Sequence, residues 1–367
     1  MGELHEVVVT APHERSIYFV VPDSIDDPAK VSGGNVYDRY VRDGLRSAGW
    51  QVRMVLVPEL PLPAGPLSNL PDGALVLVDG LIAVRESRAM AANAPRLRVI
   101  VLAHMVISLV SAQPEDPSER ADELDRERAA LRSAHRVIAT SEWTRAELVG
   151  RGLADSGDVV VVHPGTRPAA ATIPSGSGGR LLCVGVVAPH KGQDVLVNAL
   201  AGLSDLEGWT VTFVGSVSTA PAYVDELTDA IARASLIARV SFTGPLAGRA
   251  LDAAYGNADL VVVPSRAESY GMVVAEALAR GIPVVAARVG GVEEALSNRA
   301  AGLLVSLDDP AALAATLREW CTNALLRTEL AAGALEARDD ARPWSATLQA
   351  IESVLHEVAH ATAAVAV

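Results

Sequence analysis

The sequence is poor in aromatic residues and in cysteine, and it has no long apolar run. Aromatic residues make up 4% of the 367 residues, and the two cysteines, Cys183 and Cys321, lie far apart. This cysteine pattern does not fit a disulfide framework or a metal site, so we expect reduced thiols in a cytoplasmic protein. No stretch approaches about 18 apolar residues, so we expect no transmembrane segment.

Positive charge is also scarce. The formal net charge is −13, and no basic patch stands out along the chain. Because nucleic acids and anionic membranes are bound largely through lysine and arginine, we expect no nucleic-acid partner and no strong membrane docking. The first residues lack a basic start followed by an apolar run, so a secretory leader is not expected.

Valine, alanine and leucine are abundant, and hydrophobic residues make up 50% of the chain. Strand-like runs alternate with helix-like runs, which predicts an α/β fold with parallel sheets under alanine-rich helices. In the first half the pattern predicts strands at 16–21, 52–57, 74–79, 98–103 and 136–139 and helices at 35–48, 81–92, 121–133 and 142–149. The same rhythm restarts near Leu181.

The small residues of 169–179 separate these halves and indicate a flexible linker. The length suffices for two domains with sizeable cores. We therefore predict an N-terminal Rossmann-like domain over 1–170 and a second one over 180–343, facing each other across a cleft. A final helix is predicted from Trp344 to His360.

The most informative stretch is Pro264–Ala286. It predicts a strand end, a loop, a helix over 270–279 that Gly281 terminates, and a next strand that Pro283 opens. Glu268 lies in the loop, and Glu276 lies two turns inside the helix.

The amides at the helix start would be free to bind a phosphate, and each carboxylate could accept hydrogen bonds from hydroxyls. A ligand with hydroxyls at both ends and phosphates between them is a nucleotide sugar. A surface loop followed by an ordinary amphipathic helix is the alternative.

This segment resembles the donor-site signature of the retaining glycosyltransferases of family 4, which have two Rossmann-like domains in a GT-B type fold. The resemblance implies that Glu268 holds hydroxyls of the transferred sugar and that Glu276 holds the ribose. It also implies that the phosphate side is lined by Ser269, Tyr270, Gly271 and Met272. The final helix, with the tail to residue 367 (344–367), is expected to cross back onto the first domain.

Three further positions fit the same resemblance. The Gly33–Gly34 pair precedes the first predicted helix, where paired glycines let a phosphate approach the backbone. Lys191, between a predicted strand and helix, would neutralise the leaving diphosphate. The family usually has an arginine five residues earlier, where this chain has Val186, and Arg266 is a candidate replacement. A tight turn and a surface lysine are the alternative interpretations.

His104 follows the strand at 98–103 and is expected to face the crevice, because α/β proteins bind ligands at the carboxyl ends of their strands. The resemblance places a histidine near the reacting sugar, although a buried core histidine is the alternative. The proposed catalytic residues are therefore His104, Lys191 and Glu268. No Asp-x-Asp pair is poised for a metal, so none is expected.

Together these features predict a retaining, metal-independent glycosyltransferase without a cofactor. The donor would be a UDP- or GDP-sugar, and the acceptor a small molecule, lipid or glycan bound in first-domain loops such as 58–71 and 108–118. Two other functions stay open: a sugar-nucleotide 2-epimerase, and a non-catalytic nucleotide-sugar binder, which the missing arginine at Val186 makes worth keeping.

Overall fold

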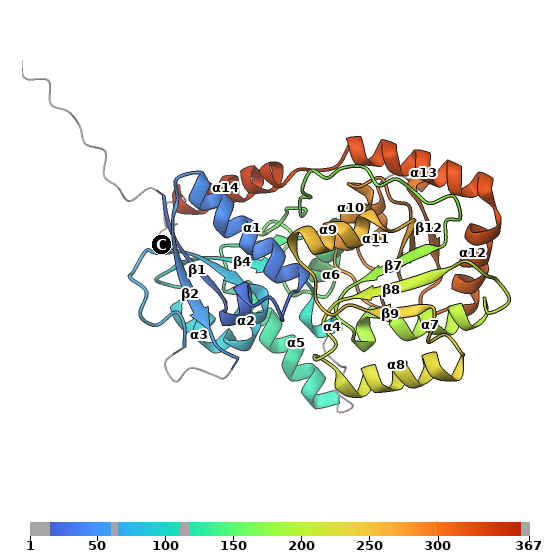
Figure 1. Ribbon diagram of the computed structural model, residues 1–367. Helices are drawn as coiled ribbons and strands as arrows, with labels where there is room; N and C mark the ends of the chain where they lie inside the picture. Colours follow the sequence, from blue (N-terminus) through green and yellow to red (C-terminus); the bar gives the residue numbers. More distant parts are fainter. Residues whose placement is uncertain (1–14, 60–64, 111–116, 298, 361–367) are drawn as a thin grey trace, which may run out of the picture.

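A computed structural model describes residues 15–59, 65–110, 117–297 and 299–360 of the chain. It contains two six-stranded sheets, each in its own α/β domain, and every strand pairing is parallel (Figure 1). The predicted fold class, two Rossmann-like domains facing a cleft, is therefore confirmed. The predicted loops 58–71 and 108–118 lie partly outside the described residues.

The first sheet has the strand order β2-β1-β3-β4-β5-β6. Its strands are β1 (Ser16–Pro22), β2 (Gln51–Val57), β3 (Leu75–Asp79), β4 (Arg98–Ala103), β5 (Arg136–Ala139) and β6 (Val159–Val161). Its helices are α1 (Gly33–Ser47), α2 (Gly80–Arg85), α3 (Ser87–Asn93), α4 (Ile107–Val110), α5 (Pro117–Arg132) and α6 (Glu142–Gly150). The central strands are apolar along their length because helices cover both faces of the sheet.

The second sheet has the order β12-β11-β10-β7-β8-β9. Its strands are β7 (Arg180–Val184), β8 (Thr210–Val214), β9 (Val240–Phe242), β10 (Leu260–Val263), β11 (Val284–Ala287) and β12 (Gly302–Val305). Its helices are α7 (Gln193–Ala201), α8 (Pro221–Arg233), α9 (Gly248–Gly256), α10 (Met272–Leu278), α11 (Val292–Leu296), α12 (Pro310–Thr322) and α13 (Ala324–Asp339).

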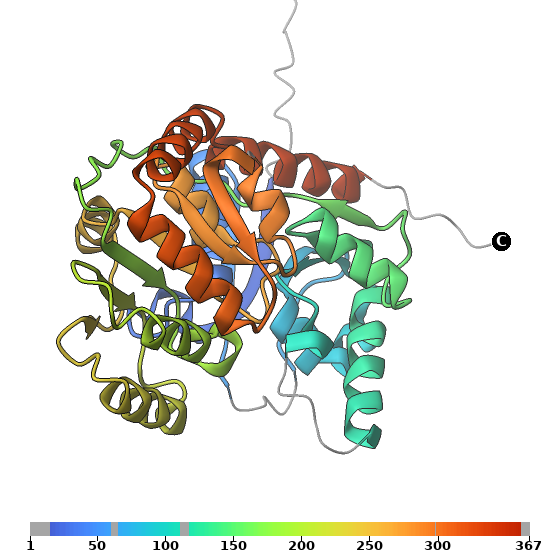
Figure 2. The ribbon, with the colours of Figure 1, turned by 90° about the vertical axis from the view of Figure 1, so that its right-hand side faces the viewer.

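The last helix, α14 (Trp344–His360), lies over the first domain beside α1 (Figure 1, Figure 2). Its approach to α1 is close, because a Cβ at Gly44 would lie 2.1 Å from Leu348 Cδ1. Trp50 Nε1 also donates a hydrogen bond to Glu352 at 2.9 Å. The predicted return of this helix to the first domain is thus confirmed.

The chain passes between the domains at two points that touch. Thr166 N donates to the carbonyl oxygen of Arg342 at 2.8 Å, and Thr166 forms an isolated β-bridge with Pro343. A Cβ at Gly165 would lie 2.4 Å from Trp344 Cα, so only glycine lets the two passing segments come this close.

Two predictions about local structure differ from what is observed. The helix predicted at 81–92 is two helices, α2 and α3, which meet at Glu86. The linker at 169–179 is fastened to the second domain, since Thr172 N donates to Arg280 O at 2.8 Å and Ser175 N to Asp259 at 2.6 Å. Within the described ranges, none of the helices is both long and apolar enough to cross a bilayer.

Candidate active site

The two sheets point their carboxyl ends at one cavity of about 330 Å³ between the domains. From the first domain it is lined by the start of α1 and by residues after β3 and β4, and from the second by the loops after β7, β8 and β10. The predicted site residues among its lining are Gly33, Gly34, His104, Lys191, Glu268, Ser269, Tyr270, Gly271, Met272 and Glu276. Residues far apart in the sequence are therefore brought to one place.

Lys191 and Glu268 form an ion pair inside this cavity. Lys191 Nζ lies 2.7 Å from Glu268 Oε1, and the buried Ser265 hydroxyl donates to the same oxygen at 2.8 Å. Both charged side chains are mostly buried, with 23% and 12% of their surface exposed. Pairing holds the cation and the carboxylate in fixed positions, so an anion and a hydroxyl could be bound side by side.

The 268–271 loop turns into α10 at Gly271, whose φ of +96° suits glycine. In the described part of the chain, no acceptor binds the amides of Gly271 and Met272. Gly33 faces this point from the other domain, since a Cβ there would lie 3.4 Å from Met272 Sδ. The glycine start of α1 and the start of α10 therefore meet across the cavity.

Glu276 is held by a residue that the sequence analysis did not single out. The hydroxyl of the fully buried Tyr255 donates to Glu276 Oε2 at 2.7 Å. Burial raises the pKa of Glu276, while the Tyr255 hydrogen bond and the nearby Arg280 oppose that rise. One carboxylate oxygen is thus fixed by Tyr255, and Glu276 itself lines the cavity.

The Gly290–Gly291 turn supports the 268–271 loop from its outer side. Gly291 N donates to Glu268 O at 3.1 Å. A Cβ at Gly290 would lie 1.6 Å from Glu268 O, and one at Gly291 would lie 2.4 Å from Ser269 O. Side chains at either position would displace the loop, so these two glycines shape the site without lining the cavity.

Arg266 is not among the residues that line the cavity. Its guanidinium binds Asp194 and Asp308, each at 2.7 Å, and Pro189 O at 2.7 Å. It is therefore engaged in a structural network and is not available as the replacement cation suggested above. Val186 does line the cavity, and among the described lining residues Lys191 is the sole lysine or arginine.

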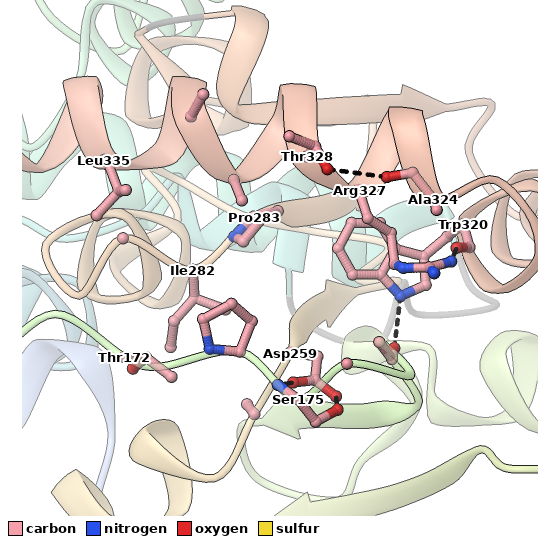
Figure 3. A pocket seen from close by; sticks show the side chains of 17 residues that line it. Thr172, Ser175, Asp259, Ile282, Pro283, Trp320, Ala324, Arg327, Thr328 and Leu335 are labelled. Atoms are coloured by element: carbon pink, nitrogen blue, oxygen red, sulfur yellow. Dashed lines mark hydrogen bonds between the residues drawn. The ribbon is translucent and has the colours of Figure 1, made fainter.

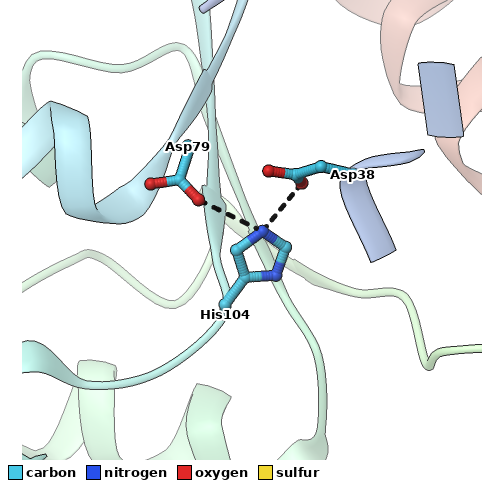
Figure 4. A group of neighbouring side chains, drawn as sticks. All are labelled: Asp38, Asp79 and His104. Atoms are coloured by element: carbon cyan, nitrogen blue, oxygen red, sulfur yellow. Dashed lines mark hydrogen bonds and ion pairs between the residues drawn. The ribbon is translucent and has the colours of Figure 1, made fainter. Parts of the chain in front are cut away.

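His104 is held by two carboxylates, as Figure 4 shows. Its Nε2 lies 2.8 Å from Asp38 Oδ1 and 3.5 Å from Asp79 Oδ2. The other oxygen of Asp79 accepts hydrogen bonds from Leu81 N and Ile82 N and so caps α2. Gly34 leaves room for the ring, because a Cβ there would lie 3.3 Å from His104 Cδ2.

The two carboxylates favour the charged imidazolium. Burial alone would lower the pKa of His104, but Asp38 and Asp79 raise it from 6.5 to about 9. Burial and the charge of Asp38 also raise the pKa of Asp79, to about 7. Sequence reasoning could have found Asp79, because it ends a strand at the same sheet edge as His104.

These shifts predict a pH-dependent stability. A histidine whose pKa is raised by folding stabilises the folded state. For His104 this contribution is complete below the ordinary pKa of 6.5 and is lost as the pH rises through about 9. The raised pKa of Asp79 acts in the same direction. Between pH 6 and pH 9.5 we expect the Tm of the parent protein to fall by more than the Tm of Asp38→Asn falls. Differential scanning calorimetry measures both. Asp43→Asn, on the exposed side of α1, is the control, and equal slopes in all three proteins would contradict this explanation.

Among the described residues, Asp38, Asp79 and His104 also form a group whose ligand atoms lie within 4.8 Å of one another, close enough to hold a metal ion. However, the Nε2 that would bind a metal is engaged by Asp38 at hydrogen-bond distance. We therefore interpret the group as a hydrogen-bonded ion pair that fixes the ring.

A second cavity, of about 490 Å³, lies on the other side of the second domain, between the linker and α13 (Figure 3). Its polar groups already have partners in the protein. The carboxylate of Asp259 accepts hydrogen bonds from Ser175 and Arg180, and Trp320 Nε1 donates to Gly178 O. The remaining lining is mainly apolar, so this cavity lacks the groups for the chemistry described above.

Comparison with known proteins agrees with this geometry. The model of the family "Glycosyl transferases group 1" matches residues 175–336. The chain is 30% identical over 383 residues to D-inositol 3-phosphate glycosyltransferase 1 of Catenulispora acidiphila, a match that covers 89% of this chain and 92% of that protein. It is 35% identical over 234 residues to D-inositol 3-phosphate glycosyltransferase of Salinispora arenicola, covering 57% and 52%.

The chain thus spans only about half the length of the Salinispora relatives that it matches. Among solved structures, sucrose-phosphate synthase from Thermosynechococcus elongatus superimposes with a TM-score of 0.77 at 23% identity, covering 95% of this chain and 100% of that one. This likeness shows a common fold. Together with the nearly full-length match to the Catenulispora protein, it shows that the chain belongs to the group 1, or family 4, glycosyltransferases of GT-B fold.

Proposed function

We propose that the chain is a retaining, metal-independent glycosyltransferase that uses a nucleotide sugar as donor. The observation that carries the proposal is that Glu268 and Glu276 line a single cavity with Lys191, and that the free amides of Gly271 and Met272 lie between the two glutamates in the sequence. Hydroxyl acceptors at both ends and phosphate donors in the middle match a nucleoside diphosphate sugar.

In this arrangement the side chains bind and orient the donor. Glu268 accepts hydrogen bonds from the sugar and Glu276 from the ribose. Lys191 exchanges part of its pairing with Glu268 for the diphosphate and stabilises the charge that develops when the glycosidic bond breaks. The glycine starts of α1 and α10 let the diphosphate approach backbone amides from both domains.

Retention would follow from reaction on one face of the sugar, where the departing diphosphate takes the proton of the acceptor hydroxyl. Neither Glu268 nor Asp79 is placed as a free nucleophile, since Glu268 is paired with Lys191 and Asp79 caps α2. A cation and oriented amides can neutralise the leaving group, so the proposal includes no divalent metal.

The first domain suggests the class of acceptor. Asp79 and His104 face the cavity from this side, and its described lining residues include no lysine or arginine. Carboxyl groups accept hydrogen bonds from hydroxyls. We therefore propose a hydroxyl-bearing acceptor, whether a small molecule, a lipid or a glycan. The relatives named for D-inositol 3-phosphate make inositol and its 3-phosphate an informative pair to compare.

The test begins with thermal shifts of the protein with UDP, GDP, ADP and dTDP, because a ligand that binds the native state raises Tm according to its affinity. We propose that UDP or GDP is the nucleotide that binds. The matching nucleotide sugars are then incubated with acceptors, and the anomeric configuration of the product is read by NMR, with and without EDTA.

An α-linked product from an α-linked donor, formed equally with EDTA, would support the proposal. An inverted product or loss of activity with EDTA would contradict those parts of it. An epimerised nucleotide sugar without glycoside would instead indicate a 2-epimerase, and tight nucleotide binding with neither transfer nor donor hydrolysis would indicate a binding protein.

A further inference from the structure

The 268–271 loop is fastened to the opposite domain through its own backbone. Ser141, just before α6, is fully buried, and its Oγ lies 2.5 Å from Ser269 O. The Thr144 hydroxyl lies 3.3 Å from the same carbonyl oxygen. Both hydroxyls come from the first domain and the carbonyl from the second. A carbonyl that accepts hydrogen bonds from two hydroxyls is held more firmly than one with a single partner.

The Ser141 hydroxyl can donate its proton to this contact. As the N-cap of α6, its oxygen accepts a hydrogen bond from Thr144 N at 2.9 Å. Capping uses only a lone pair, so the proton remains available for a second partner. Two acceptors lie within reach of that proton, Thr144 Oγ1 at 2.9 Å and Ser269 O at 2.5 Å, and through the shorter contact the serine joins the start of a first-domain helix to the loop in the other domain.

Glu294 makes a second connection, in which the second domain supplies the side chain and the first domain supplies backbone amides. It belongs to α11, which begins directly after the Gly290–Gly291 turn. Its carboxylate accepts hydrogen bonds from Glu142 N at 2.9 Å and Trp143 N at 2.7 Å, the first amides of α6. His163 Nε2 lies 3.0 Å from the same carboxylate. A carboxylate bound to helix-start amides is favourable, since the positive end of the helix dipole lies there.

The two connections both join the start of α6 to the segments around one loop of the second domain. Ser141 binds the loop carbonyl, and Glu294 binds α6 to the helix whose first turn packs against that loop. We propose that Ser141 and Glu294 are positioning residues that fix the 268–271 loop only when the two domains are docked together. Their role in transfer rests on the proposed function, whereas their effect on loop geometry does not.

The consequence for catalysis is geometric. Ser269 lies between Glu268 and the free amides at Gly271 and Met272, so a shift of its carbonyl moves both the sugar contact and the phosphate contact. A misplacement of about 1 Å can lower the rate about a hundredfold. We expect Ser141→Ala and Glu294→Ala each to lower kcat/KM for the nucleotide sugar by about tenfold to a hundredfold. Ser141→Thr, which keeps the hydroxyl, should restore most of it.

Amide hydrogen exchange tests the positioning without any ligand. In the whole chain, Ser141→Ala and Glu294→Ala should accelerate exchange at the amides of Val274, Ala275 and Gly291, which donate to carbonyls of the 268–271 loop, and Ser141→Thr should not. Asn323→Ala is the matched control, because it removes the N-cap of α13 at a distance from the cavity. Glu293→Gln controls for charge loss on α11.

These experiments distinguish the positioning role of Ser141 and Glu294 from the proposed function. If the alanine variants exchange and turn over like the parent, or if Asn323→Ala produces the same loss, the positioning role is wrong. If the parent neither binds nucleotides nor transfers sugar, the proposed function fails, and the exchange data alone decide the positioning role. Should Ser141→Ala not fold, Glu294→Ala and Ser141→Thr give the same decision.

Discussion

Replacing Lys191 by alanine is expected to lower kcat for sugar transfer by about a hundredfold or more, with the fold intact. Removal of one preorganised charge contact typically has an effect of this size. Among the described lining residues Lys191 is the sole lysine or arginine, and the usual arginine position is Val186. Glu268 would also lose its partner at 2.7 Å and keep only the Ser265 hydroxyl. Steady-state kinetics with the identified donor, together with Tm, measure the effect.

The chain provides a close control for this substitution. It contains only two lysines, and the other, Lys30, pairs with Glu59 on the surface. Lys30→Ala should therefore turn over the donor at the parent rate. Parent-like kcat in Lys191→Ala, or an equal loss in both variants, would show that the diphosphate does not depend on Lys191.

Replacing Gly290 by alanine is expected to disrupt both the site and the stability of the second domain. Gly290 has a φ of +57°, which most residues adopt at a penalty of about 1–2 kcal/mol. The added Cβ would also lie 1.6 Å from Glu268 O, so the loop carrying Glu268 must move. We expect a lowered Tm and a loss of transfer of about a hundredfold, measured by calorimetry and donor turnover.

Gly73→Ala separates these two effects. Gly73 has a similar φ of +75°, but a Cβ there meets nothing within 4 Å. This variant should show only the backbone penalty, with normal kinetics. If Gly290→Ala lost no more stability and no more activity than Gly73→Ala, the turn would not be shaping the loop.

The local pattern of the sequence sufficed to predict the elements that carry the site. The helix stop at Gly281 and the proline at the next strand identified the stretch from β10 to β11, and the strand ends identified His104. These are short-range signals, in which a few neighbouring residues determine where an element ends. The glutamates on either side of the α10 start followed from the same stretch.

Contacts between distant segments could not be predicted in this way. Tyr255 behind Glu276 and Asp38 beside His104 depend on how helices pack, which no local spacing reports. Ser141 shows the difference clearly, since its N-cap bond joins residues three apart in the sequence, whereas its bond to Ser269 O requires the docked domains. Arg266 was suggested by its proximity to Glu268 in the sequence, but the structure directs its side chain to Asp194 and Asp308.

The paired passages of the chain at Thr166 and Arg342 restrict how the two halves of the molecule can move. The two connecting segments are bonded to each other at this point. A rotation about this point keeps these bonds, whereas a straight separation of the domains would break them. After proteolytic cleavage within 169–179, the C-terminal fragment would stay attached to the first domain only through noncovalent contacts, among them the packing of α14.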